Sequence, residues 1–126
     1  FINGSDRVWK RMRSDAKYAR VLASSKTWLS TTGPLHDMSS RYFEVSCSRT
    51  VPLTNRIPDD YSHIFKADEN VIVFKEDCSN LLDKLSDSIE NGKVLDEMAC
   101  NLRDDVLHNH SYKVRAKELL TVMESL

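Results

Sequence analysis

The chain has 126 residues, of which 40% are hydrophobic and 29% charged. These proportions are typical of one globular domain with a real core, and they exclude a disordered chain. No apolar run approaches the roughly 20 residues that span a bilayer, and the start does not resemble a signal peptide. The first residue is Phe1 rather than Met, so we expect this single domain to be part of a longer protein.

The net charge of −1 is unevenly distributed. Residues 1–26 carry seven Lys or Arg against two Asp, whereas residues 57–105 carry five Lys or Arg against thirteen Asp or Glu. A basic start suits a phosphate group, although the cations of residues 7–13 suit a solvated helix face equally well. The acidic second half does not suit a protein that wraps nucleic acid, so we expect no nucleic-acid partner.

Three cysteines, Cys47, Cys78 and Cys100, are widely spaced and form no C-x-x-C pair. This pattern predicts small buried thiols in a reducing compartment, and therefore a cytoplasmic protein without disulfides. His108 and His110 lack a third ligand at helical spacing and are expected to mark a helix end. We expect no metal site.

The first half of the chain is expected to alternate helices and strands. Residues 1–2 are typical of a strand end, and residues 6–24 keep a helical spacing of apolar side chains with a break near Asp15. Residues 26–31 mix Trp, Leu and Thr without a helical period, which favours a short buried strand. After a Gly-Pro break, residues 37–47 are predicted to form a short helix.

The pattern continues with a strand at residues 49–55, although Pro52 does not favour a central position in a sheet. A helix is expected from residue 57, because Pro58 and two acids suit a first turn. Four consecutive apolar residues make 70–74 the clearest strand in the chain.

Three amphipathic helices are then predicted, and their apolar faces are expected to pack on the core. Asp77 is expected to cap the first of them, which places Leu81, Leu82, Leu85 and Ile89 on one face and ends at residues 91–92. The others cover about 95–106 and 111–126. Alternating strands and helices predict an α/β fold, namely a three-layer Rossmann-like sandwich with a small parallel sheet and C-terminal helices.

The candidate site is the junction between the strand at 26–31 and the helix at 37–47. A strand, a Gly-containing loop and a helix start commonly bind phosphate-bearing ligands in open α/β sheets. Arg41 and Glu44 share a helix face, where they form either a surface ion pair or a site in which the carboxylate binds ribose hydroxyls. Ser39 and Ser40 are either helix caps or phosphate ligands.

The remaining loop residues are open to two interpretations. His36 and Asp37 are either solvated or supply a base. No dinucleotide-binding glycine fingerprint, Walker A motif or hydrolase nucleophile motif is present in the chain, so these classes have no support.

Residues 41–54, R-Y-F-E-V-S-C-S-R-T-V-P-L-T, resemble a segment of the two-domain, GT-B type glycosyltransferases. The similarity is closest to the spore-maturation (CgeB-like) branch of the glycosyl transferases group 1 families, in which an R-x-F-E helix leads to a P-L-L-T strand. Residues 70–74, 77–81 and 110–115 (H-S-Y-K-V-R) resemble later family segments in the same order. The resemblance covers roughly residues 18–120. His36 stands where the family usually has an acid, eight residues before Glu44.

The resemblance implies the C-terminal, donor-binding half of a glycosyltransferase that transfers a sugar from a nucleotide-diphosphate sugar. It implies that Glu44 holds the ribose, and that Arg41 and the preceding loop lie against the diphosphate and the sugar. The loop residues concerned are Gly33, His36, Asp37, Met38, Ser39 and Ser40. Catalysis would be independent of metal and cofactor.

The partners implied by the resemblance are the nucleotide-sugar donor, a saccharide, protein or other acceptor, and an N-terminal acceptor domain of the same enzyme. Peripheral membrane association through that other half is compatible with this interpretation. The alternative is a non-catalytic Rossmann-like interaction domain that binds a protein through its acidic helices. A receiver-like domain is disfavoured, because residues 26–31 and 50–54 supply no acidic cluster.

Overall fold

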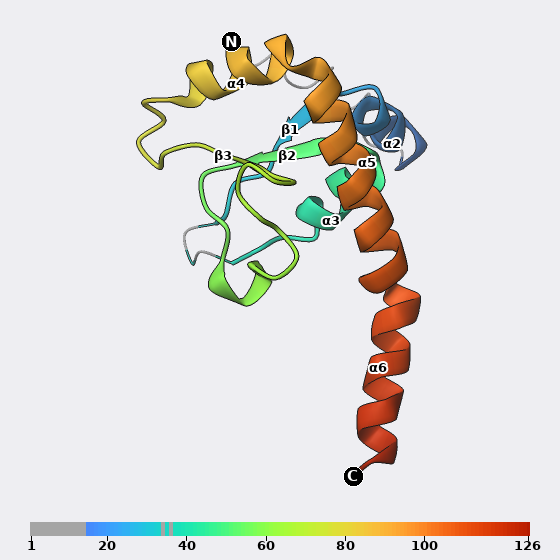
Figure 1. The fold of residues 1–126 in the computed structure, drawn as a ribbon. Coiled ribbons are helices and arrows are strands. Elements are labelled where there is room, and N and C mark those ends of the chain that lie inside the picture. The colour runs from blue at the N-terminus through green and yellow to red at the C-terminus, as the bar shows by residue number, and fades with distance from the viewer. Residues whose placement is uncertain (1–14, 34, 36) are drawn as a thin grey trace, which may run out of the picture.

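The computed structural model describes residues 15–33, 35 and 37–126, so the elements predicted within residues 1–14 lie outside the described range. Strands and helices alternate along the first part of this range, and three helices follow (Figure 1). The elements are α2 (Asp15–Ala23), β1 (Thr27–Leu29), α3 (Arg41–Cys47), β2 (Val51–Thr54), the 3₁₀ helix η1 (Asp59–Tyr61), β3 (Ile72–Val73), α4 (Leu81–Glu90), α5 (Gly92–Asn109) and α6 (Tyr112–Glu124).

The three strands form one parallel sheet in the order β1-β2-β3. Thr27 pairs with Val51 between the first two strands, and Leu53 pairs with Ile72 between the second and third. Parallel neighbours require a crossover, and α3 supplies the one between β1 and β2. The predicted α/β class is therefore confirmed: the chain is a three-layer Rossmann-like sandwich with a small parallel sheet and C-terminal helices.

Pro52 lies in the central strand, contrary to the preference of proline for sheet edges. The Val51 N–H donates to the Lys26 carbonyl on the β1 side. Because successive strand residues direct their backbone groups to opposite sides, the Pro52 nitrogen faces the β3 side. Pairing with β3 begins only at Leu53 with Ile72. The missing N–H of Pro52 therefore costs no hydrogen bond of the ladder.

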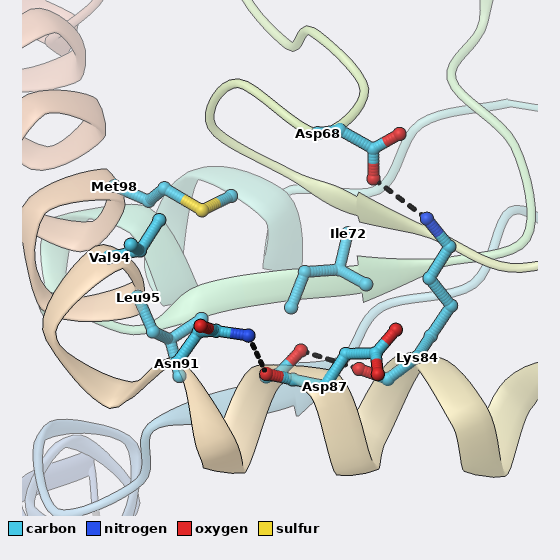
Figure 2. Close-up of a pocket in the computed structure, with 9 residues that line it drawn as sticks. Asp68, Ile72, Lys84, Asp87, Asn91, Val94, Leu95 and Met98 are labelled. Carbon is cyan, nitrogen blue, oxygen red and sulfur yellow. Dashed lines mark hydrogen bonds and ion pairs between the residues drawn. The ribbon is translucent and has the colours of Figure 1, made fainter.

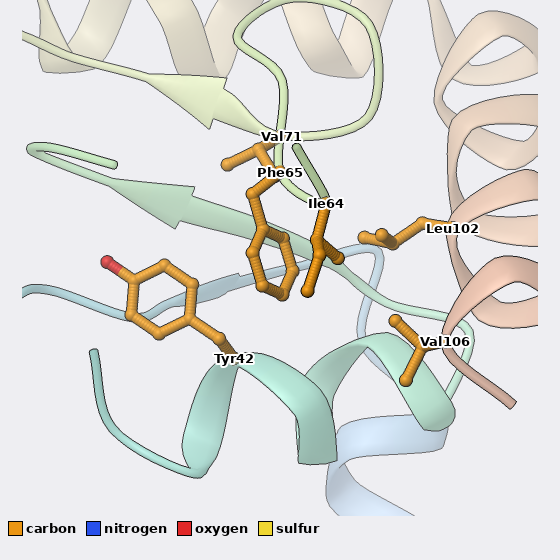
Figure 3. Packing of buried hydrophobic residues seen from close by; sticks show 6 residues of the cluster. All are labelled: Tyr42, Ile64, Phe65, Val71, Leu102 and Val106. Atoms are coloured by element: carbon orange, nitrogen blue, oxygen red, sulfur yellow. The ribbon is translucent and has the colours of Figure 1, made fainter. Parts of the chain in front are cut away.

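α5 connects the two hydrophobic clusters of the core. Its buried residues, Leu95, Ala99, Leu102 and Val106, follow the three- and four-residue spacing of one helix face. Figure 3 shows the cluster around the second half of α5, which consists of Tyr42, Ile64, Phe65, Val71, Leu102 and Val106. The cluster around the first half of α5 consists of Val51, Leu53, Ile72, Phe74, Leu95 and Ala99. α5 thus fixes α3 relative to the sheet.

Polar groups inside the core are hydrogen-bonded. The Tyr42 hydroxyl is buried against the Thr54 hydroxyl and donates to the Arg56 carbonyl at 3.2 Å. Thr50 Oγ1 donates to the Leu22 carbonyl at 2.6 Å, which attaches the end of α2 to the start of β2. Because an unpaired buried hydroxyl is costly, these bonds specify how α2, α3 and β2 fit together.

The elements expected between residues 26 and 74 are all shorter in the structure than their sequence patterns suggested; α3, for example, begins at Arg41 rather than at residue 37. Two of them are greatly reduced. The helix expected from residue 57 consists only of η1, and the strand expected at 70–74 is reduced to β3 with an isolated bridge between Ala67 and Val71. The Asn70 side chain accepts the Lys66 N–H and donates to the Ile64 carbonyl. These two bonds close a tight loop, and neither a longer helix nor a strand start fits within it.

α4 buries a narrower face than predicted. Leu81 and Leu85 pack on the core, whereas Leu82 and Ile89 are 79% and 78% exposed. At 3.6 residues per turn, Leu82 and Ile89 lie about 100° and 80° around the helix from Leu81, on its flank. Asn80, rather than Asp77, directly precedes the helix, and Asp77 instead accepts the Ser79 N–H.

α6 extends away from the body of the domain (Figure 1). Its apolar residues Leu119, Leu120 and Met123 are between 56% and 61% exposed, so the predicted packing of this helix on the core is wrong. α6 continues nearly along the line of the second half of α5, which carries it past the end of the sheet. None of the described helices has the length and apolarity needed to cross a membrane.

The cysteines are free but not buried as predicted. Cys47 and Cys78 are exposed and Cys100 is partly exposed. Cys78 lies in a turn with a positive φ of 60°, where its side chain faces solvent. Cys47 ends α3 at the edge of a cavity described below.

Candidate functional site

The carboxylate of Glu44 is held between two hydroxyl groups. Ser40 immediately precedes α3, and a spacing of four residues lets its Oγ donate to Glu44 Oε1 at 3.0 Å. Tyr18 of α2, 26 residues away in sequence, donates its hydroxyl to Glu44 Oε2, also at 3.0 Å. Both carboxylate oxygens are thereby oriented while the Glu44 side chain stays exposed to solvent.

Tyr18 connects this carboxylate to the sheet. Its ring packs edge-on against Trp28 of β1, with 6.2 Å between ring centroids. Partial burial, followed by the adjacent Glu44 carboxylate, raises the pKa of the Tyr18 hydroxyl, and Arg41 opposes this shift. The hydroxyl therefore keeps its proton at neutral pH and remains a donor. Tyr18, Arg41 and Glu44 form one polar cluster at the start of α3.

A cavity of about 610 Å³ opens beside Glu44. One wall comes from α3 and η1, through Ser40, Phe43, Glu44, Cys47 and Tyr61. The other comes from the end of α5 and the start of α6, through Val106, Leu107, His110, Ser111, Tyr112 and Arg115. Ligand sites commonly enclose about 300–1,000 Å³ and combine an apolar lining with a few polar groups, as this cavity does.

The α3 wall of the cavity is positioned by aromatic packing. The Phe43 ring lies edge-on to Tyr61 at 6.3 Å and to Phe65 at 5.4 Å between centroids. Cys47 follows Glu44 by three residues on the same helix, and burial raises the pKa of its thiol despite the opposing charge of Arg103. The thiol is therefore neutral at physiological pH.

The second wall is organised by the segment from His110 to Arg115, called here the α5–α6 corner. The Arg115 guanidinium donates to His110 Nδ1 and to Glu118 Oε2, both at 2.7 Å. Because a guanidinium only donates, Nδ1 of His110 must accept, and the imidazole carries its proton on Nε2. Asp105 Oδ2 lies 3.8 Å from that Nε2.

The charge state of His110 follows from its surroundings. Burial of the imidazole, with the nearby charges of Arg115 and His63, lowers its pKa, while Asp105 and Glu118 act in the opposite direction. His110 is therefore neutral at physiological pH. A neutral imidazole is what the bond from Arg115 requires, so the corner is electrostatically self-consistent.

The structure brings together some of the predicted site residues and separates others. Ser40 and Glu44 line the cavity, and Arg41 lies in the polar cluster next to it. The loop residues Asp37 and Ser39 are exposed without lining the cavity, and Met38 packs against the core cluster around Tyr42. His36 lies outside the described residues.

Gly33 lies in open space. It is exposed, and a Cβ added there would meet no atom within 4 Å among the described residues. Its φ is not positive, so the backbone itself does not require glycine at this position. What this position offers a ligand is therefore the open space around it.

A smaller cavity of about 190 Å³ lies between β3, α4 and α5 (Figure 2). Its only lysine, Lys84, is already paired with Asp68 at 2.9 Å. Asn91 donates to the Asp87 carbonyl at 2.9 Å. A volume below the usual range for ligand sites and the pairing of Lys84 with Asp68 make this cavity the weaker candidate.

Within the part of the chain that the structure describes, no three side chains of His, Cys, Asp or Glu gather where they could hold a metal ion. His108 and His110 instead fall at the end of α5, as predicted: the helix ends at Asn109, and His110 is its C-terminal cap.

A model of the glycosyl transferase-like family matches residues 2–121, which is nearly the whole chain. The chain belongs to the glycosyl transferase-like family. The predicted glycosyltransferase class is thereby confirmed, and with it a sugar donor and an acceptor as substrates. Comparisons with curated proteins and with solved structures find no match.

Sequence patterns do not reveal every residue of this candidate site. Tyr18 was not a candidate, because a single tyrosine on a helix carries no spacing signal that links it to a residue in another helix. In the sequence, the α5–α6 corner is recognisable only as a family segment, H-S-Y-K-V-R, and its pattern indicates no function. The only signal for this segment is its order: it follows the R-x-F-E helix along the chain. That order does not reveal that the two segments face each other across a cavity.

Proposed function

We propose that this chain is the donor-binding half of a GT-B type glycosyltransferase of the CgeB-like branch, and that Glu44 binds the ribose of a nucleotide-diphosphate sugar. One observation carries this proposal: the Glu44 carboxylate is oriented by Tyr18 and Ser40 at the edge of a cavity of ligand size. The family match and the Rossmann-like sheet support the same interpretation.

The carboxylate is suited to a vicinal diol. An ionised carboxylate offers about four lone-pair positions, and the hydroxyls of Tyr18 and Ser40 use one on each oxygen. The remaining positions accept the 2′- and 3′-hydroxyl protons of a ribose. Because both oxygens are already oriented, little side-chain entropy is lost when the ribose binds.

The diphosphate lies, in this proposal, against Arg41 and the loop from Gly33 to Ser40. The Arg41 side chain is exposed and the surroundings of Gly33 are open, which leaves room for the phosphates. In the transfer step, an acceptor oxygen bonds to the anomeric carbon, and the bond from that carbon to the diphosphate oxygen breaks. The electron pair leaves on the diphosphate, and a fixed cation stabilises the charge that develops there.

The proton of the acceptor passes to a base that an N-terminal acceptor domain supplies. This arrangement is independent of metal, because Arg41 supplies positive charge to the leaving group. The enzyme is cytoplasmic in this proposal, and its membrane contacts, where the acceptor requires them, belong to the acceptor domain. The carboxylate oriented by two hydroxyls at the edge of this cavity is the observation that favours a ligand site over a non-catalytic interaction domain.

The experiment is an isothermal calorimetric titration of the 126-residue chain with UDP, GDP and ADP, repeated with Glu44→Gln. A matched control is Glu97→Gln, which removes one exposed acid from α5 outside the cavity. We expect at least one nucleoside diphosphate to bind, with affinity reduced at least tenfold by Glu44→Gln and unchanged by Glu97→Gln. Binding that is equally strong in all three proteins would contradict the role of Glu44, and no binding by any would count against the donor site itself.

A further inference from the structure

The cavity continues beyond Glu44 along α3. Glu44 and Cys47 are three residues apart, so Cys47 lies about 4.5 Å further along the helix axis. If the diphosphate lies near Arg41 and the ribose at Glu44, the next group of the donor in covalent order is the nucleobase. Phe43 and Cys47 line the cavity on this side.

This part of the cavity has an aromatic and aliphatic lining, which suits an apolar ring. The Phe43 and Tyr61 rings form one wall, and the aliphatic Val106 and Leu107 of α5 form the other. Nucleobases bind to aromatic and apolar side chains through their faces.

The polar groups at the α5–α6 corner are predominantly donors. Arg115 has five N–H donors, and the bonds to His110 and Glu118 use two of its nitrogen atoms without exhausting them. Nε2 of His110 carries the proton but lies 3.8 Å from Asp105 Oδ2, so the remaining N–H groups of Arg115 are the donors that a ligand can use. Donors of this kind bind carbonyl oxygens, which uracil, thymine and guanine have on their edges and adenine lacks.

We propose that the α5–α6 corner closes a nucleobase subsite that prefers bases with ring carbonyl oxygens, with Arg115 as the residue that recognises them. This inference rests on the proposed donor site and extends it to the base. In this arrangement Glu118 and His110 are positioning residues, because they hold the guanidinium from two sides. The base lies between Phe43 and Leu107, over the thiol of Cys47.

The chain contains a direct reporter of this placement. Cys47 lines the cavity, whereas Cys78 is a second free cysteine with an exposed side chain, in the turn before α4 and outside the cavity. The rate of alkylation by iodoacetamide is measured at both cysteines by peptide mass spectrometry, without ligand and with saturating UDP, ADP or ribose 5-phosphate. We expect UDP to slow alkylation of Cys47 at least fivefold and to leave Cys78 unchanged, and ribose 5-phosphate to protect neither.

Base preference is tested by calorimetry on the same chain. We expect UDP or GDP to bind at least fivefold more tightly than ADP, and Arg115→Gln to reduce this ratio to about one. Lys117→Gln, an exposed charge on the same helix outside the cavity, is the control and should preserve the ratio. Circular dichroism on each variant verifies that α6 is intact.

The outcomes separate this inference from the donor site. If UDP binds and Glu44→Gln weakens it, but Cys47 stays fully reactive, the donor site stands and the nucleobase subsite is overturned. Equal affinity for UDP, GDP and ADP, or a base preference that survives Arg115→Gln, overturns the role of Arg115. If no nucleoside diphosphate binds at all, the inference fails together with the donor site.

Discussion

The hydroxyl of Tyr18 lies 3.0 Å from Oε2 of Glu44, and this bond joins α2 to α3 across 26 residues of sequence. With Ser40 on the other oxygen, it fixes the carboxylate before any ligand arrives. Preorganised groups bind more tightly because less conformational entropy is lost on binding. Tyr18 is therefore part of the candidate site, although it does not line the cavity.

Replacing Tyr18 with Phe should weaken binding of a nucleoside diphosphate by about threefold to tenfold, the effect of losing one hydrogen bond worth about 1 kcal/mol. Calorimetry on Tyr18→Phe measures this change. Ser48→Ala is a matched control, because its hydroxyl donates to the main-chain carbonyl of Glu44 rather than to the carboxylate. A Tyr18→Phe protein that binds as tightly as the parent would show that the bond has no role in binding.

Tyr42→Phe should lower the free energy of unfolding by about 1–2 kcal/mol, since it removes a buried hydroxyl bonded to Thr54 and to the Arg56 carbonyl. Urea unfolding followed by circular dichroism measures the loss. Tyr61→Phe is the control. It keeps the ring contact with Phe43, so the free energy of unfolding should change by no more than about 0.5 kcal/mol. Equal effects of the two substitutions would mean that the Tyr42 hydroxyl does not stabilise the junction of α3 and β2.

Leu102 tests the assignment of α5 as the connection between the two core clusters. It is 1% exposed, so Leu102→Ala should cost about 2–5 kcal/mol of unfolding free energy through lost burial and the cavity that remains. Leu82→Ala makes the same chemical change on the exposed flank of α4 and should cost less than about 0.5 kcal/mol. Similar melting temperatures for the two variants would contradict the described packing of α5.

The stability of the α5–α6 corner should depend on pH through His110. The pKa of His110 in the folded chain lies below the value of 6.5 expected for the unfolded chain. At pH values between these two pKa values, the unfolded chain therefore binds more protons than the folded chain. The stabilising contribution is therefore complete above about pH 6.5 and is lost as the pH falls through the lowered pKa. Protonation also places a positive charge against Arg115 and removes the acceptor of its bond.

Thermal unfolding between about pH 7.5 and pH 5.0 checks this dependence. The melting temperature of His110→Asn should fall less on acidification than that of the parent. His108→Asn is the control: its imidazole is exposed at the end of α5, and the parent slope should be retained. An unchanged slope in His110→Asn would show that this histidine does not couple pH to stability.

Local patterns were sufficient to predict the sheet and the start of the site. A strand within residues 26–31 and the helix with Arg41 and Glu44 near its start follow from neighbouring residues, and the structure has them in that order as β1 and α3. The central place of Pro52 could not be predicted. It depends on where pairing with β3 begins, and this is a property of two strands together.

The remainder of the candidate site depends on contacts between distant segments. The bond from Tyr18 to Glu44 requires that α2 and α3 lie on the same side of β1, and the wall from Arg115 requires the break between α5 and α6. Neither relationship leaves a periodic signal in the sequence. The exposed apolar residues of α6 were misassigned to the core for the same reason, because amphipathic spacing does not reveal whether another element covers the face.

The central claim is that the carboxylate of Glu44 binds the ribose diol, and a ligand-by-variant cycle tests it most directly. The nucleoside diphosphate that binds most tightly and its 2′-deoxy form are titrated by calorimetry into the parent chain and into Glu44→Ala. We expect the parent to prefer the ribonucleotide by about tenfold, as for one hydrogen bond to a charged group, and Glu44→Ala to bind both forms equally. A preference for the ribonucleotide that is just as large in Glu44→Ala would contradict the claim.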